Sequence, residues 1–118
     1  MPYRELFVIL HFEKMKQEEV IQRIKELGEK ILPEGASLWL YGSRARGDAR
    51  PDSDYDLLIL LDKNSLSSMD YNAVFDFRML GVDIDEEINP TVYPKKQWIK
   101  WDYVPFHDNV EQDKIVLR

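Results

Sequence analysis

The sequence predicts an α/β (α+β) domain in which short β-strands alternate with amphipathic α-helices. Apolar residues recur at helical spacing in two segments, residues 16–31 and 66–80. Short apolar runs of strand length lie between and after these segments, at residues 37–41, 57–61 and 88–93. Glycine, proline or polar residues separate neighbouring runs, so we expect turns and short loops between the elements.

Length and composition restrict the class of protein. The chain has 118 residues, which suits one domain around a single core. Its content of 44% apolar and 32% charged residues is typical of a folded protein, and its net charge of −6 disfavours non-specific binding to nucleic acid. The absence of cysteine excludes disulfides and thiolate metal sites. No apolar run is long enough to cross a membrane, and we expect a cytoplasmic protein.

Residues 1–14 are an N-terminal extension of uncertain role. The apolar run at residues 6–10 fits a strand, a buried helical turn or a docking arm, and its spacing does not distinguish these. It is short for a signal peptide, and residues 11–14 contain no small-residue cleavage site. Met15 is an alternative start of the chain, so we expect one domain at residues 15–118.

The two helices have recognisable ends. The first, residues 16–31, places apolar residues on one face and is followed by Pro33, which ends it. We expect the second helix to begin at the N-cap residue Ser65 and to stop at Gly81, because glycine commonly follows the last turn of a helix. Both apolar faces are expected to pack on a sheet.

The last third of the chain contains shorter elements. Pro90 lies within the third strand and indicates an edge position or a bulge, since proline cannot donate a hydrogen bond. Pro94 begins a short helix, and another short helix surrounds Val110. Residues 115–117 fit a last strand or a docking tail. The aromatic residues of this region fit a cover of the sheet or, alternatively, an exposed partner-binding patch: Trp98, Trp101, Tyr103 and Phe106.

The most informative stretch is the turn and strand at residues 42–61. Gly42 and Ser43 end an apolar run, where a backbone turn can present N–H groups to a phosphate. Asp54 and Asp56 open the next strand at i and i+2, a spacing that points both carboxylates to one face. A phosphate cradle opposite two metal-binding carboxylates suits phosphoryl or nucleotidyl transfer.

Gly42-Ser43, ten intervening residues and Asp54-x-Asp56 resemble the signature of the DNA polymerase β-like nucleotidyltransferase superfamily. The string GSRARGDARPDSDYDLLILL is similar to the minimal, MNT-type nucleotidyltransferases, which occur with HEPN-domain partners in toxin–antitoxin pairs. Each dipeptide pattern alone is weak evidence, whereas their fixed spacing on strand, turn and strand is specific. The resemblance covers the chain from about Met15 to its C-terminus and implies a small mixed sheet with helices packed against it.

The resemblance also implies an activity. An NMP group, AMP if the nucleotide is ATP, would pass to an acceptor hydroxyl with Mg²⁺ as the cofactor. Asp54 and Asp56 would hold Mg²⁺, and Gly42, Ser43 and Arg44 would bind the nucleotide. Little chain follows the third strand, so the acceptor surface would come from another polypeptide, a HEPN-type toxin in related proteins.

The alternatives are an antitoxin-like module that binds nucleotide with little catalysis, and an enzyme that adenylylates a small molecule such as an antibiotic. A homo-oligomer is left open.

The third carboxylate of the site is the open question. By comparison with family sequences, the position that carries it in the next strand falls on Asn89, which is a neutral ligand and cannot act as a base. Glu87 lies two residues earlier, on the same face of the strand if no bulge intervenes, and is our candidate for the catalytic role. Asp85, or Asp83 in a different register, is the alternative, as is a solvated acidic turn.

The loop between the two strands carries two arginines with two interpretations. Arg44 and Arg46 can contact phosphate through their guanidinium groups, or they can pair with Asp48 or a neighbouring carboxylate and brace the loop. We favour bracing for Arg46 and leave Arg44 open between the two roles. Tyr55 points away from the aspartates and is expected to be a core or surface residue.

Overall fold

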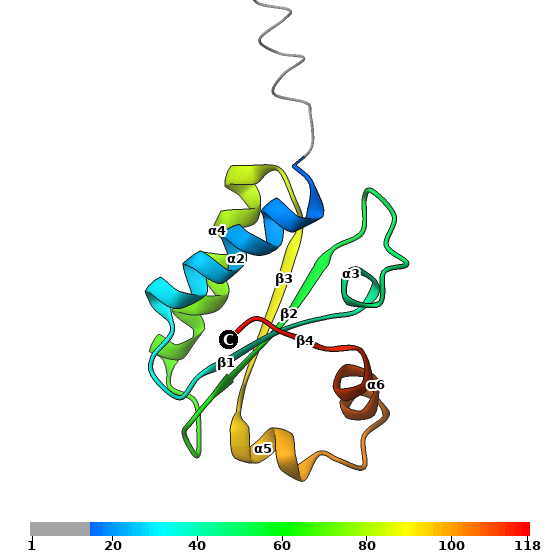
Figure 1. Cartoon of the computed structure of the whole chain (residues 1–118). Helices are drawn as coiled ribbons and strands as arrows, with labels where there is room; N and C mark the ends of the chain where they lie inside the picture. The colour runs from blue at the N-terminus through cyan, green and yellow to red at the C-terminus, as the bar shows by residue number, and fades with distance from the viewer. Residues whose placement is uncertain (1–14) are drawn as a thin grey trace, which may run out of the picture.

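The computed structural model describes residues 15–118, and the predicted N-terminal extension lies outside these residues. A four-stranded mixed sheet with strand order β3-β2-β1-β4 runs through the centre of the molecule (Figure 1). Strand β1 (Ser37–Tyr41) pairs antiparallel with both β2 (Tyr55–Leu61) and β4 (Ile115–Val116), whereas β3 (Ile88–Pro94) runs parallel to β2. The predicted α+β class and the small mixed sheet are therefore confirmed, and residues 115–116 are a strand.

Helices cover both faces of the sheet (Figure 1). Helices α2 (Gln17–Ile31) and α4 (Asn72–Ile84) pack on one face, and α5 (Lys95–Lys100) and α6 (Pro105–Asp113) pack on the other. Strand β2 supplies both cores: its odd-numbered leucine and isoleucine side chains face α2 and α4, while Leu58 and Leu60 face Trp98 and Val110. The five-residue apolar run is thus buried on both sides, as its sequence predicts.

Strand β3 forms an edge of the sheet, as Pro90 predicts. The backbone N–H of Tyr55 donates to the carbonyl of Glu87, so the odd-numbered residues of β3 direct their backbone groups towards β2. The even-numbered residues Pro90 and Pro94 therefore direct their backbone groups towards the free edge of the sheet. A missing N–H there breaks no hydrogen bond between the strands. These prolines also remove donors that another strand would need in order to pair there.

The second helix differs from its predicted bounds at both ends. It begins after a short 3₁₀ segment, η1 (Ser68–Tyr71), whose capping box is formed by Ser67 and Asp70 rather than by Ser65. It also continues through Gly81 to Ile84, and Asp85 ends it with a left-handed backbone at φ 56°. A Cβ on Gly81 would lie 2.5 Å from the carbonyl oxygen of Glu86. Gly81 is therefore a glycine that permits close packing, not a helix cap.

The aromatic residues near the C-terminus differ in burial, and Trp98 has the predicted role of covering the sheet. Trp98 is buried against β2, and Tyr93 and His107 stack on its ring, so it covers the sheet. Tyr103 is 78% exposed and belongs to no core cluster.

Within residues 15–118, no helix combines the length and the apolar character that crossing a membrane requires.

Candidate active site

Asp54 and Asp56 lie at the start of β2, on the face of the sheet that α5 and α6 cover. The strand register pairs Asp56 with Asn89 of β3, and the Asn89 side-chain amide donates to Oδ2 of Asp54 at 2.6 Å. No bulge interrupts the register between Ile88 and Pro94. The structure therefore brings three oxygen-bearing side chains together on two parallel strands, with Asn89 where the family comparison places the third carboxylate.

The electrostatics of this group favour a bound cation. Burial raises the pKa of Asp56, and the charge of Asp54 raises it further, against the hydrogen bond from Asn89 and the charge of Arg46. Neither aspartate forms an ion pair with any residue of the described chain. Two neighbouring carboxylates without a counter-ion are a costly arrangement, which a divalent cation would relieve.

Gly42 allows the turn after β1 to approach Asp56. Its backbone has φ 77° and ψ −159°, a region that is almost restricted to glycine, and a Cβ here would lie 2.5 Å from Oδ2 of Asp56. Ser43 follows as the first residue of α3 (Ser43–Arg46). Its hydroxyl and the backbone N–H groups of Ser43 and Arg44 have no hydrogen-bond partner in residues 15–118, whereas the N–H groups of Ala45 and Arg46 donate to the carbonyl of Gly42. The turn thus presents unused donors beside the carboxylates.

Arg44 is the buried cation of the loop and is already engaged by protein groups. Its guanidinium donates to the carbonyls of Pro51 and Ser53 and to the side chain of Gln17, at 3.0–3.3 Å. The same group lies 4.4 Å from the centre of the Tyr55 ring. This placement favours the bracing interpretation over nucleotide binding, because the donors of the guanidinium point into the loop rather than towards the aspartates.

We expect Arg44→Lys to lower the free energy of unfolding by about 2 kcal/mol, because one ammonium cannot satisfy both carbonyls and Gln17. Thermal or urea unfolding measures this. Arg46→Lys is the matched control, since Arg46 is far more exposed, and we expect it to leave stability nearly unchanged. Equal effects of the two substitutions would contradict a bracing role that is specific to Arg44.

Arg46 braces the loop from the outside. It donates to Asp48 at 3.2 Å, as the bracing interpretation predicts, and to Asp113 of α6 at 3.0 Å. Hydrogen bonds to these two carboxylates raise the pKa of Arg46 above its usual value. Asp113 is a partner that sequence reasoning missed, because nothing in the spacing indicates that α6 returns to the loop 67 residues away.

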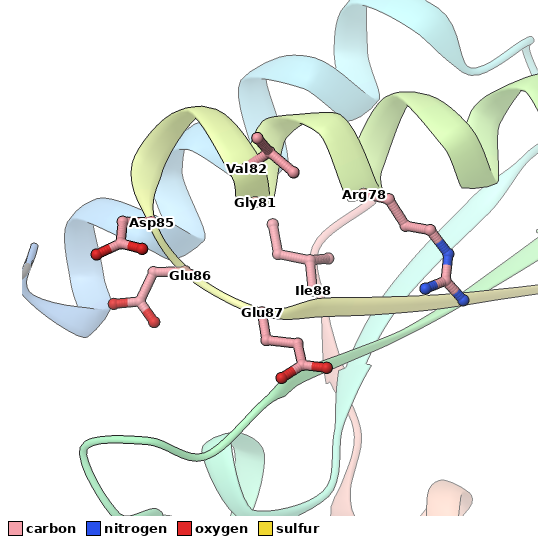
Figure 2. Close-up of a pocket in the computed structure, with 7 residues that line it drawn as sticks. All are labelled: Arg78, Gly81, Val82, Asp85, Glu86, Glu87 and Ile88. Carbon is pink, nitrogen blue, oxygen red and sulfur yellow. The ribbon is translucent and has the colours of Figure 1, made fainter.

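The acidic residues before β3 are spread over different elements. Asp83 belongs to α4 and Asp85 ends it, so neither lies on the strand that the alternative register requires. Glu87 accepts the Tyr55 N–H through its carbonyl and so lies beside Asp54. Figure 2 shows its side chain on the face of β3 opposite to Ile88, which is the face of Asn89. Glu87 is exposed, and its side chain forms no hydrogen bond within residues 15–118, unlike that of Asn89.

Tyr41 is a further residue of the site that sequence reasoning missed. It pairs with Asp56 across the antiparallel β1–β2 ladder, so both side chains lie on the same face. Its ring contacts Phe106 of α6 edge-to-face at 5.6 Å between centroids. Burial raises the pKa of Tyr41, and the charge of Asp56 contributes to this. The rings of Tyr41 and Phe106 thus form an apolar side of the carboxylate site. The antiparallel pairing of the two strands is the feature from which the position of Tyr41 beside Asp56 could have been predicted.

The donor set fits Mg²⁺ that is shared with a phosphate ligand. Nowhere in residues 15–118 do three carboxylate, imidazole or thiolate groups gather closely enough to hold a metal ion. Mg²⁺ commonly takes one or two carboxylates and completes its shell with water and substrate phosphates. Asp54, Asp56 and the amide oxygen of Asn89 meet that requirement, with the N–H donors of the Gly42 turn nearby for the phosphates.

Comparisons with solved structures find chains of similar fold. A toxin–antitoxin crystal structure with AMP-PNP is 18% identical and has a TM-score of 0.60, over 83% of this chain and 72% of that one. A structure of an MNT antitoxin with the tri-AMPylated HEPN toxin of Shewanella oneidensis is 15% identical and has a TM-score of 0.54, over 87% of this chain and 72% of that one. A mutant of the toxin–antitoxin MntA–HpeT is 14% identical and has a TM-score of 0.54, over 88% of this chain and 73% of that one. These likenesses show a shared fold.

Among curated proteins, no sequence match was found. Sequence family models give a direct result: the nucleotidyltransferase domain model matches residues 14–116, which is nearly the whole chain. The glycine turn and the aspartate pair that carry the resemblance lie within this match. The chain therefore belongs to the nucleotidyltransferase domain family.

Proposed function

We propose that this protein is a Mg²⁺-dependent nucleotidyltransferase that transfers AMP from ATP to a hydroxyl group of a partner protein. The observation that carries the proposal is the convergence of Asp54, Asp56 and Asn89 beside the Gly42 turn. A group that must hold both a cation and phosphates needs acidic oxygens and N–H donors on facing sides. Membership of the nucleotidyltransferase domain family supports the reaction class.

Asp54 and Asp56 would hold Mg²⁺ through their carboxylates, with Glu87 as a proposed further carboxylate at the edge of the site. The bound metal would neutralise phosphate charge and favour in-line attack of the acceptor hydroxyl on the α-phosphate, with pyrophosphate as the leaving group. Asn89 orients Asp54 through the 2.6 Å hydrogen bond and keeps its oxygen available as a neutral ligand. In this role the amide fixes the geometry of the carboxylates without adding a third negative charge.

The Gly42 turn would bind the phosphates. The free donors of this turn are the Ser43 hydroxyl and the backbone N–H groups of Ser43 and Arg44, and the glycine lets the turn approach the carboxylate site. Arg44 contributes indirectly, since its bonds to Pro51 and Ser53 fix the loop that connects the turn to Asp54. We therefore assign it to positioning rather than to direct contact with nucleotide.

A protein acceptor is proposed from the structural neighbours. One of these structures pairs an MNT antitoxin with a HEPN toxin that carries AMP groups, and another contains the ATP analogue AMP-PNP. By this analogy, ATP is the proposed nucleotide and a HEPN-type protein is the proposed partner. A hydroxyl of that partner would receive the AMP group.

A second candidate function is a nucleotide-binding antitoxin with little catalysis. Asn89 favours it, because an amide at this position cannot take a proton from the acceptor hydroxyl. Such a protein would bind ATP with Mg²⁺ and would inhibit its partner by binding alone. The two candidates predict the same nucleotide complex and differ in whether AMP becomes attached to the partner.

The substitution Asn89→Asp tests how the residue at position 89 affects the rate of AMP transfer. We expect the substitution to raise the rate of AMP transfer by roughly 100-fold, because it supplies a carboxylate base beside Asp54 and Asp56. Without Mg²⁺ the variant is expected to unfold at a lower temperature, since three carboxylates then repel one another. Asn89→Gln is the control that keeps the amide. An unchanged or lower rate in Asn89→Asp would show that Asn89 is already the competent residue.

The proposal is tested by binding and transfer with one set of purified proteins. Calorimetry with a non-hydrolysable ATP analogue, with and without Mg²⁺, measures nucleotide binding. Incubation with α-phosphate-labelled ATP and the product of the adjacent gene, followed by gel electrophoresis, measures transfer to protein. Metal-dependent binding together with a labelled partner supports the enzyme. Metal-dependent binding without label on any protein, in that mixture or in host lysate, supports the antitoxin module instead.

A further inference from the structure

One face of α4 exposes large apolar side chains. Tyr71, the last residue of η1, is followed at helical spacing by Phe75, Met79 and Val82. Phe75 is 62% exposed and Val82 is 70% exposed, and all four residues lie outside the core clusters of the described chain. We call these four residues the α4 stripe. A continuous apolar row on one helix face, in a chain with 32% charged residues, indicates a surface that another molecule covers.

The α4 stripe ends at three consecutive acidic residues, which we call the acidic loop: Asp85, Glu86 and Glu87. Together with Arg78, Gly81, Val82 and Ile88, these residues line a surface cavity of about 510 Å³ (Figure 2). The figure shows the side chain of Arg78 extending from α4 towards β3, with its guanidinium apart from the carboxylates of the loop. None of the three carboxylates forms an ion pair within residues 15–118. The cavity thus joins an apolar surface to unneutralised negative charge.

The acidic loop connects this surface to the candidate active site. The carbonyl of Glu87 accepts the N–H of Tyr55 at 2.9 Å, which places the end of the loop beside Asp54. The α4 stripe and the aspartates lie on opposite faces of the sheet, and both reach the same end of β3. A molecule that covers the stripe and the loop would therefore lie at the edge of the carboxylate site.

We propose that the α4 stripe and the acidic loop form the docking surface for the protein that receives AMP. The complementary surface of that protein is apolar and carries lysine or arginine side chains, which neutralise the loop. This inference rests on the proposed function, because it assigns the docking site of the same acceptor. Docking here would hold the acceptor protein while one of its hydroxyl groups reaches the aspartates.

The charge pattern favours such a partner over a second copy of this chain. A two-fold pairing of α4 with itself would place each acidic loop near the start of the other α4. That end of α4 carries the carboxylates of Asp70 and Asp76, and the nearby Lys63 is already paired with Asp70 at 2.8 Å. Self-pairing would therefore bring each acidic loop towards further carboxylates, whereas a basic partner would neutralise it.

Glutamate substitutions in the α4 stripe test the proposal. Phe75→Glu and Val82→Glu place a charge in the apolar contact without disturbing the core, since both side chains are mainly solvent-exposed. With α-phosphate-labelled ATP and the product of the adjacent gene as acceptor, we expect KM for the acceptor to rise at least about 10-fold. The value of kcat, the affinity for the ATP analogue and the melting temperature should stay close to those of the wild type. Ile99→Glu is the matched control, because Ile99 is 68% exposed on α5.

A charge reversal tests the acidic part of the surface separately. Glu86→Lys should raise KM for the same acceptor and weaken its dependence on salt, because the proposed contact to basic side chains becomes repulsive. Glu87 is left unchanged in this experiment because it is a candidate residue of the active site. A wild-type KM that does not depend on salt would contradict the electrostatic part of the proposal.

Direct binding keeps the test independent of catalysis. If the wild type transfers no label, the proposed enzyme fails, and sedimentation velocity of the chain with the adjacent gene's product measures docking by itself. Loss of that complex in Phe75→Glu and Val82→Glu, but not in Ile99→Glu, would still support the docking surface. Binding and KM that are unchanged in the stripe variants would overturn it. So would a homodimer that these two substitutions dissociate, since the stripe would then bind a second copy.

Discussion

Replacing Asp56 with asparagine is expected to reduce AMP transfer on the order of 1,000-fold or more, because the site loses one of its two carboxylate metal ligands. The same substitution should raise the melting temperature of the metal-free protein by a few degrees. Burial raises the pKa of Asp56 and the charge of Asp54 adds to the rise, so the ionised side chain destabilises the fold at neutral pH. Activity and stability are thus expected to change in opposite directions.

The pH dependence gives this prediction a definite sign. A carboxyl whose folded-state pKa lies above its ordinary value of 3.8 stabilises the fold fully below that value, and the contribution is lost as pH rises through the raised pKa. The stability difference between Asp56→Asn and the wild type should therefore appear on going from acidic to neutral pH. Mg²⁺ should raise the melting temperature of the wild type and have little effect on the variant. A destabilised Asp56→Asn at neutral pH without metal would contradict this explanation.

Gly42→Ala is expected to reduce transfer by about 100-fold, because the new methyl group would displace the carboxylate of Asp56 from the metal position. A Cβ at this position would lie 2.5 Å from Oδ2 of Asp56, and the backbone at φ 77° is itself strained for alanine. We also expect a loss of stability of about 1–3 kcal/mol from the backbone alone. Steady-state transfer and thermal unfolding measure the two effects.

Gly47→Ala separates backbone strain from the clash. Gly47 ends α3 with φ 87°, and no atom lies within 4 Å of its added Cβ. This control should cost about 1 kcal/mol of stability and leave transfer within a few-fold of the wild type. If both alanine variants lost activity equally, the contact between Gly42 and Asp56 would not be the reason for the glycine.

Local sequence patterns were sufficient to predict most of the helices and strands of the fold. The runs at residues 37–41 and 57–61 are apolar, of strand length and bounded by turn residues, and their strands form close to the predicted bounds. Pro90 correctly indicated an edge strand, because the loss of an N–H has few solutions in a sheet. The first helix also agrees to within one residue, since its apolar stripe and Pro33 fix both its face and its end.

The errors arose where a residue's role depends on a distant contact. The sequence predicts a helix end at Gly81 because glycine commonly caps helices, whereas in the fold the carbonyl of Glu86 occupies the space that a side chain would need. Arg44 could not be assigned from sequence, because its partners include Gln17, which is 27 residues earlier. The α4 stripe is a feature that the helical spacing did not indicate, because its residues lie outside the predicted apolar face.

For the candidate site, the sequence supplied the residue types and the fold supplied their arrangement. Spacing alone placed Asp54 and Asp56 on one face of β2, and the parallel register of β3 adds Asn89 to them. No sequence pattern predicts the hydrogen bond between Asn89 and Asp54, because it depends on how two strands 35 residues apart align. The same register leaves Glu87 at the edge of the site.

The most direct test of nucleotidyl transfer uses ATP labelled at either of two phosphates. The wild type, the product of the adjacent gene and Mg²⁺ are incubated with α-labelled or γ-labelled ATP in parallel, and the proteins are separated and counted. The account predicts that only the α-label becomes attached to the partner, and that Asp56→Asn abolishes this labelling. Attachment of the γ-label instead would mean phosphoryl transfer and would contradict the proposed reaction.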